Sequence, residues 1–157
     1  MSIVFQRVPF RMHRSGWLIV AFCMIIGALF SGWSYAPQIG LLLLASLLLH
    51  EAGHMLMAMR LGVPVREFGL RMGGAYIRRA CAKRRRDEIL ISAAGPLMNL
   101  LLTVPALFLH HIGAQIALCN FLLGIVNLLP LPSSDGLRIL RNVFNTQPQI
   151  QPAPNRA

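Results

Sequence analysis

The residues with the clearest chemical meaning are three polar side chains in the middle of an apolar run, LLLHEAGHMLM. His50 and His54 are four residues apart, so in a helix they lie on one face, about 40° apart around the axis and about 6 Å apart along it. Two imidazoles at that spacing converge on one zinc ion, and Glu51 is placed to act as a general base on a water molecule. Ionisable side chains are costly within an apolar span, so their presence indicates a functional site. A buried hydrogen-bond network that locks helices together is the alternative.

A catalytic zinc site needs a third protein ligand and an open fourth position. The best-placed candidate is Asp135, which follows two prolines in the sequence NLLPLPSSDG. Pro130 and Pro132 end the preceding helix because proline lacks a backbone donor and clashes with the preceding turn, and Gly136 permits a close or left-handed backbone. These features agree equally well with Asp135 returning to the apolar helices and with a helix that ends in a surface turn.

The elements that must hold these side chains are long apolar segments. Of the 157 residues, 55% are hydrophobic and 13% are charged, against about 25% charged in an average soluble domain. A membrane span takes about 20 residues, and four segments qualify: residues 17–35, 38–59, 89–109 and 112–131. We therefore predict an α-helical polytopic membrane protein with about four transmembrane helices. The first segment is long for the apolar core of a signal peptide, which favours an uncleaved span.

Positive charge predicts the orientation of these spans. The chain carries 15 Lys and Arg residues against 5 Asp and Glu residues, a formal net charge of +10. All 15 lie before the first segment, between the second and third, or after the fourth. The positive-inside rule makes that side cytoplasmic, so both termini are predicted to be cytoplasmic. The basic cluster at residues 78–86 predicts contact with anionic lipid headgroups, not with nucleic acid.

The connection over residues 62–88 has a different character from the apolar segments. In its first part, residues 63–74, short alternation and Gly and Pro residues predict strands and a turn. A small β-like segment folded against the helices at the cytoplasmic surface satisfies the backbone polar groups that a membrane leaves without partners. We expect residues 1–141 to form one integral membrane domain, and the polar, Pro- and Gln-rich residues 142–157 to form a disordered tail.

Four motifs in this order resemble the site-2 protease family of intramembrane zinc metalloproteases. They are HEAGH from His50, the turn at Gly73-Gly74, AAGPLMN from Ala93 to Asn99, and NLLPLPSSDG from Asn127 to Gly136. The resemblance covers residues 38–141 and is to the compact members without a PDZ insertion, similar to the sporulation-factor processing proteases. The chain departs from the family's usual Pro-Leu-Asp-Gly-Gly at Ser133, Ser134 and Leu137.

The resemblance implies that His50, His54 and Asp135 bind one zinc ion per chain and that Glu51 is catalytic. It also implies a core of the second to fourth spans with the first span peripheral, in a bacterial inner membrane. The expected reaction is cleavage of a peptide bond in or near a transmembrane segment of a substrate protein, as in regulated intramembrane proteolysis. The alternative is a catalytically degenerate homologue that binds membrane proteins.

Three further residues or segments have expected roles around this reaction. A substrate helix must unwind before cleavage, and we expect residues 65–70 to hold the unwound peptide by edge pairing. Asn99 and Asn127 either orient the substrate or the ligand loop, or make hydrogen bonds between helices.

Overall fold

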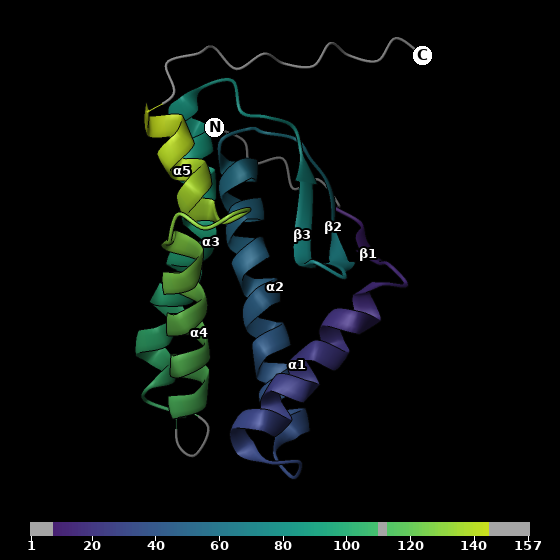
Figure 1. Cartoon of the computed structure of the whole chain (residues 1–157). Helices are drawn as coiled ribbons and strands as arrows, with labels where there is room; N and C mark the ends of the chain where they lie inside the picture. The colour runs from purple at the N-terminus through teal and green to yellow at the C-terminus, as the bar shows by residue number, and fades with distance from the viewer. Residues whose placement is uncertain (1–7, 110–112, 145–157) are drawn as a thin grey trace.

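The computed structural model describes residues 8–109 and 113–144. In this part of the chain there are five helices and one small sheet (Figure 1). The helices are α1 (Gly16–Ser31), α2 (Ala36–Arg60), α3 (Arg85–Ala106), α4 (Gly113–Leu128) and α5 (Asp135–Phe144). The strands are β1 (Phe10–Met12), β2 (Val65–Arg71) and β3 (Gly74–Arg79). The predicted helical fold with a β segment between the second and third apolar helices is therefore confirmed.

Two helices, α2 and α3, are long and apolar enough to cross a membrane. The other apolar helices, α1 and α4, have 16 residues each, or about 24 Å at 1.5 Å per residue, which is less than the apolar thickness of about 30 Å of a typical bilayer. Helix length alone therefore supports two membrane spans, α2 and α3, and does not establish the four that the sequence predicts.

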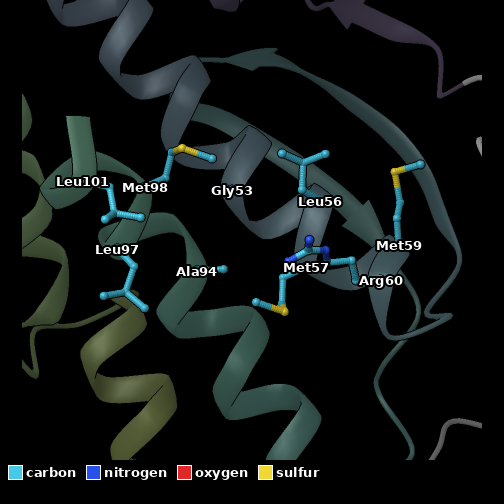
Figure 2. A pocket seen from close by; sticks show the side chains of 9 residues that line it. All are labelled: Gly53, Leu56, Met57, Met59, Arg60, Ala94, Leu97, Met98 and Leu101. Atoms are coloured by element: carbon cyan, nitrogen blue, oxygen red, sulfur yellow. The ribbon is translucent and has the colours of Figure 1, made fainter. Parts of the chain in front are cut away.

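The helix α2 lies between the small sheet and the group formed by α3, α4 and α5 (Figure 1). α2 and α3 pack side by side. An apolar groove of about 470 Å³ lies on the surface between them, and Leu56, Met57, Leu97 and Met98 line it together with Arg60 (Figure 2). Many large apolar side chains of α3 are exposed, with Leu101 at 71%. An apolar surface of this kind is typical of contact with lipid or with another protein.

The sheet has the order β1-β2-β3, with β1 parallel and β3 antiparallel to β2. β2 is the central strand, and β1 covers its outer edge at Phe68, Gly69 and Leu70. The expectation that residues 65–70 offer a free edge is therefore wrong for residues 68–70. The three residues of β1 carry no alternation that would predict a strand. The free edge nearer to α2 belongs to β3 (Figure 1). The β2–β3 turn ends at Gly74, whose φ of 110° favours glycine.

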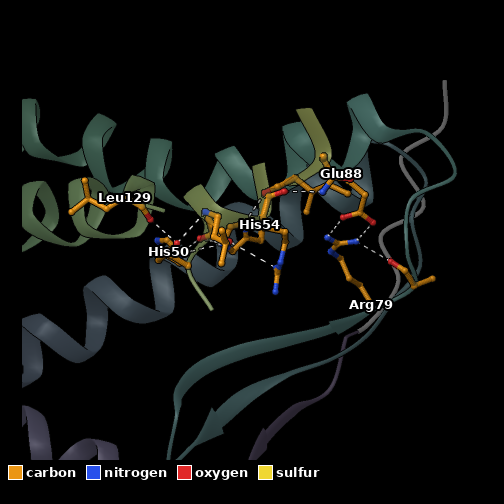
Figure 3. A network of polar contacts seen from close by, with 12 residues as sticks. His50, His54, Arg79, Glu88 and Leu129 are labelled. Carbon is orange, nitrogen blue, oxygen red and sulfur yellow. Dashed lines mark hydrogen bonds and ion pairs between the residues drawn. The ribbon is translucent and has the colours of Figure 1, made fainter. Parts of the chain in front are cut away.

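Two buried carboxylates fix the sheet and the segment that leads to α3. Glu67 accepts a hydrogen bond from the Tyr76 hydroxyl, which lowers the pKa of Glu67. Glu88 accepts hydrogen bonds from Arg79 at 2.9 and 2.5 Å, and another from the backbone N–H of Ala82 at 2.5 Å (Figure 3). A bidentate arginine–carboxylate pair is geometrically specific, so it sets where α3 begins relative to β3.

Candidate metal centre

Three side chains from two distant parts of the chain meet between α2 and the start of α5. His50 Nε2 and His54 Nε2 lie 3.0 and 3.1 Å from Asp135 Oδ2, and 3.1 Å from each other. The three residues are 5%, 5% and 7% exposed. Within the described residues, they form the one cluster of His, Cys, Asp and Glu side chains with the geometry of a metal site. Asp135 thus lies against the histidines and not in a surface turn.

The donor set and its spacing fit a zinc ion. Tetrahedral zinc with bonds of about 2.0–2.1 Å places neighbouring ligand atoms about 3.3–3.4 Å apart. The three distances here are 3.0–3.1 Å, so a small outward shift of the rings satisfies zinc. Two histidines and one carboxylate are also the ligand set of catalytic zinc sites, which leave one position open for a water molecule or a substrate.

Each histidine is oriented from behind by an acceptor. His50 Nδ1 lies 2.8 Å from Asn99 Oδ1, and His54 Nδ1 lies 2.6 Å from the carbonyl oxygen of Ile91 (Figure 3). An oxygen that only accepts requires a proton on Nδ1, which leaves the Nε2 lone pair for a metal. Asn99 makes the expected hydrogen bonds between helices, to Ser46 on α2 and Asn120 on α4, and its contact with a candidate ligand histidine is a further role that the sequence does not predict. Asn127 donates to the carbonyl oxygen of Leu123 at 2.9 Å.

Gly95 provides the space that the histidine rings occupy, a role that the sequence analysis missed. A Cβ atom on Gly95 would lie 2.3 Å from His54 Nε2 and 2.8 Å from His50 Nε2. Any side chain at this position of α3 would therefore displace the two candidate ligand atoms. The signal in the sequence was a glycine in the middle of a helix, where it costs about 0.5–1 kcal/mol relative to alanine and so calls for a packing reason.

Ser134 organises the loop that carries Asp135. Its hydroxyl oxygen accepts hydrogen bonds from the backbone N–H groups of Leu137 and Leu131, both at 3.1 Å, and donates to the carbonyl oxygen of Leu129 at 2.6 Å. The bond from Leu137 is an N-cap of α5. A single hydroxyl group thus joins the end of α4 to the beginning of α5. The serine at this departure from the family pattern makes polar contacts that hold the candidate ligand in place.

Gly136 allows the first turn of α5 to pack closely against the end of α4. A Cβ atom on Gly136 would lie 2.0 Å from the carbonyl oxygen of Leu128, so no other residue fits without moving the backbone. The predicted close approach at Gly136 is confirmed, whereas the left-handed residue of this loop is Ser133, with φ of 68°. This tight junction directs Asp135 towards α2.

Glu51 lies half-buried beside the cluster. The charged groups that act on its carboxylate are His54, His50, Asp135 and Arg138. The Glu51 carboxylate is therefore near enough to the three candidate ligands to feel their charges, and it is not a member of the ligand cluster. A general base at a zinc site needs this placement.

Two histidines, an aspartate and a neighbouring glutamate are the residue types that a catalytic zinc site uses as ligands and general base. Residues 38–116, half of the chain, match the profile of Peptidase family M50. The chain belongs to this family.

Individual relatives agree with the family assignment. The chain is 35% identical over 123 residues to Rip3 of Mycobacterium tuberculosis, which carries the name zinc metalloprotease, and this match covers 69% of the chain and 31% of Rip3. It is 30% identical over 150 residues to the zinc metalloprotease MJ0392 of Methanocaldococcus jannaschii, covering 88% of the chain and 43% of that protein. The structure is similar to the site-2 protease from Methanocaldococcus jannaschii, with a TM-score of 0.69, 25% identity, and coverage of 87% of the chain and 67% of the other. The matches thus span about a third of the length of Rip3 and less than half of the length of MJ0392.

Proposed function

We propose that this protein is a zinc-dependent intramembrane endopeptidase that cleaves a peptide bond in or near a transmembrane segment of a substrate protein. The observation that carries the proposal is the meeting of His50 and His54, on the long apolar helix α2, with Asp135 at the start of α5. Glu51 follows His50 directly in the chain. Membership of peptidase family M50 supports zinc and peptide hydrolysis as the chemistry.

The proposed setting is a bacterial inner membrane crossed by α1, α2, α3 and α4. The two shorter helices need the adjoining residues, or local thinning of the bilayer, to complete a span. Both chain termini, the sheet and the basic residues 78–86 lie on the cytoplasmic side in this arrangement. Anionic lipid headgroups are the proposed partners of the basic residues.

The proposed division of labour follows from the positions of the side chains. His50, His54 and Asp135 hold the zinc ion, and Glu51 accepts the proton of the attacking water and returns it to the leaving amine. Bound zinc supplies polarisation of the scissile carbonyl group and a lowered pKa of the attacking water. Burial of all three ligand residues excludes bulk water and strengthens each electrostatic interaction in the site.

The substrate peptide is proposed to pair with the free edge of β3, since β2 is paired with β3 on one side and with β1 at residues 68–70 on the other. Strand addition holds an extended peptide through its main chain and tolerates different side chains. Proline substitutions in β3 should reduce cleavage while leaving the bound zinc in place. Cleavage at the wild-type rate would contradict this pairing.

The experiment that tests the function compares wild-type protein with Glu51→Gln and Asp135→Ala in detergent. We expect about one zinc ion per chain in the wild type and in Glu51→Gln, and much less in Asp135→Ala. Cleavage of membrane-protein substrates co-expressed with the protease should occur only with the wild type. A folded wild type that takes up no zinc would support the degenerate binding protein instead. Tight zinc binding together with equal activity of Glu51→Gln would contradict the role of Glu51.

A further inference from the structure

We propose that Asn120, on α4, is a positioning residue for His50 and acts through the side-chain amide of Asn99. The inference rests on the proposed metal site, but it concerns residues that do not touch the metal. Asn99 and Asn120 are 0% and 2% exposed, and they lie on α3 and α4. Two fully buried amides between apolar helices are costly unless every donor is satisfied.

Hydrogen bonds connect the two amides into a chain that ends at His50. The Nδ2 group of Asn120 donates to the carbonyl oxygen of Ile116 at 2.9 Å. The Nδ2 group of Asn99 donates to Asn120 Oδ1 at 2.8 Å and to the carbonyl oxygen of Ser46 at 3.2 Å. Asn99 Oδ1 is then left to face His50 Nδ1 at 2.8 Å. Both donors of the Asn99 amide are in use, and its oxygen is the end that meets the histidine.

The direction of this chain is fixed from its far end. A backbone carbonyl oxygen only accepts, so the oxygen of Ile116 turns the Nδ2 end of Asn120 towards itself and leaves Oδ1 facing Asn99. Asn99 must in turn present Nδ2 to Asn120, which places its oxygen against His50 and requires a proton on His50 Nδ1. The Nε2 lone pair of His50 is consequently available to a metal. The Ile116 carbonyl oxygen on α4, together with the Ser46 carbonyl oxygen that accepts from the same Asn99 amide, thus selects the ring form of His50.

His54 also carries its proton on Nδ1, but no other side chain is needed to hold it there, because the Ile91 carbonyl oxygen contacts His54 Nδ1 directly. The two ligand histidines are therefore oriented by different means, one by backbone and one by two side chains. α4 also leads into the loop that carries Asp135. A displacement of α4 would consequently disturb both His50 and Asp135 while leaving the orientation of His54 intact.

The test compares Asn120→Leu with a matched control, Thr103→Val, in the full-length protein in detergent. Thr103 donates to the backbone carbonyl oxygen of Asn99 at 3.1 Å, so its replacement removes a hydrogen bond to the same residue but not to the amide. Zinc affinity is measured by competition with a chelator. Histidine-labelled, zinc-loaded protein is examined by NMR for the hydrogen-bonded Nδ1–H signals of His50 and His54.

We expect Asn120→Leu to weaken zinc binding roughly tenfold, the lower end of what outer partners of ligand histidines contribute. The Nδ1–H signal of His50 should shift or exchange faster with water, while that of His54 stays unchanged. Asn120→Asp keeps an acceptor for Asn99 and should restore both properties. Thr103→Val should match the wild type.

Equal zinc affinity in Asn120→Leu and Thr103→Val, with an unchanged His50 signal, would overturn the proposal. If Asn120→Leu does not fold, the NMR measurement on the wild type tests the proposal instead. The absence of a hydrogen-bonded Nδ1–H signal of His50 in the wild type would also overturn the proposal. A wild type that binds zinc and shows the His50 signal but cleaves no substrate would contradict the proposed function and leave the relay standing.

Discussion

Replacement of Gly95 by alanine tests whether the space beside the two histidine rings is needed for zinc binding, because it adds one methyl group and leaves every candidate ligand in the chain. The methyl carbon would lie 2.3 Å from His54 Nε2 and 2.8 Å from His50 Nε2. An ordinary contact needs about 3.5 Å, so the two ligand atoms must retreat by about 1.2 and 0.7 Å. Zinc sites tolerate bond-length deviations of about 0.2 Å. We therefore expect Gly95→Ala to weaken zinc binding by at least about 100-fold, the upper end of the effects of outer residues on metal affinity.

The same substitution should not weaken the helix itself. Alanine is favoured over glycine in a helix interior by about 1 kcal/mol, so α3 gains backbone stability. A shift of α3 away from α2 would relieve the clash only by opening the helix contact at Gly53, where a Cβ atom would lie 2.6 Å from the Ala94 carbonyl oxygen. The protein should therefore remain folded while its metal affinity falls.

The assay is zinc affinity by chelator competition together with thermal unfolding in detergent, and Gly124→Ala is the matched control. A Cβ atom on Gly124 would lie 2.9 Å from Cγ and Cδ2 of Leu100 and 3.2 Å from the Pro96 carbonyl oxygen. Gly124→Ala therefore also presses a methyl group against α3, but no candidate ligand is among the atoms that this methyl group would meet. We expect Gly124→Ala to bind zinc as the wild type does. Wild-type zinc affinity in a folded Gly95→Ala protein would refute the argument that this glycine keeps the ligand space open.

Two further predictions concern the elements around the site. Ser134→Ala removes the N-cap of α5 and should destabilise the protein by about 0.5–2 kcal/mol, measured by thermal unfolding; an unchanged midpoint would show that the hydroxyl does not hold the loop. Tyr76→Phe removes the donor that lowers the pKa of Glu67, so the pKa of Glu67 should rise, as followed by NMR titration of its carboxyl carbon. A lowered pKa stabilises the fold above the unfolded value of about 4.3 and this contribution is lost as pH falls through the folded pKa. The wild type should therefore exceed Tyr76→Phe in stability near neutral pH, and the difference should shrink in acid.

The sequence predicts the helix of the two histidines and the strands that follow it, because both depend on local periodicity. The spacing of His50 and His54 places them on one face, and the alternation after Val63 becomes β2 and β3. Helix ends are less well predicted. The fourth helix stops at Leu128 and not at residue 131, because Pro130 disfavours the helical conformation of the residue before it, Leu129. The third helix begins at Arg85, earlier than residue 89.

Other features depend on contacts between distant residues, which local patterns do not carry. β1 is a three-residue strand that exists through pairing with β2. The space at Gly95 is meaningful only when α2 lies against α3. The helix α5 was not predicted, because Asp135 and Gly136 indicate a turn, although Ser134 is a good N-cap and apolar residues recur after it. α5 continues to Phe144, into the segment expected to be a tail, whose remaining residues lie outside the described part.

The origin of the third ligand has a consequence for how the protein is made. His50 and His54 precede Asp135 by 85 and 81 residues, and a ribosome adds about 5–20 residues per second. The two histidines are therefore synthesised roughly 4–17 s before the aspartate. During that interval the nascent chain has only two of its three ligands and should not hold zinc tightly. The order of the ligands along the chain thus delays assembly of the candidate metal centre until Asp135 has been synthesised. Nascent chains arrested before and after residue 135 should differ sharply in bound zinc, and equal zinc in the two would remove this explanation.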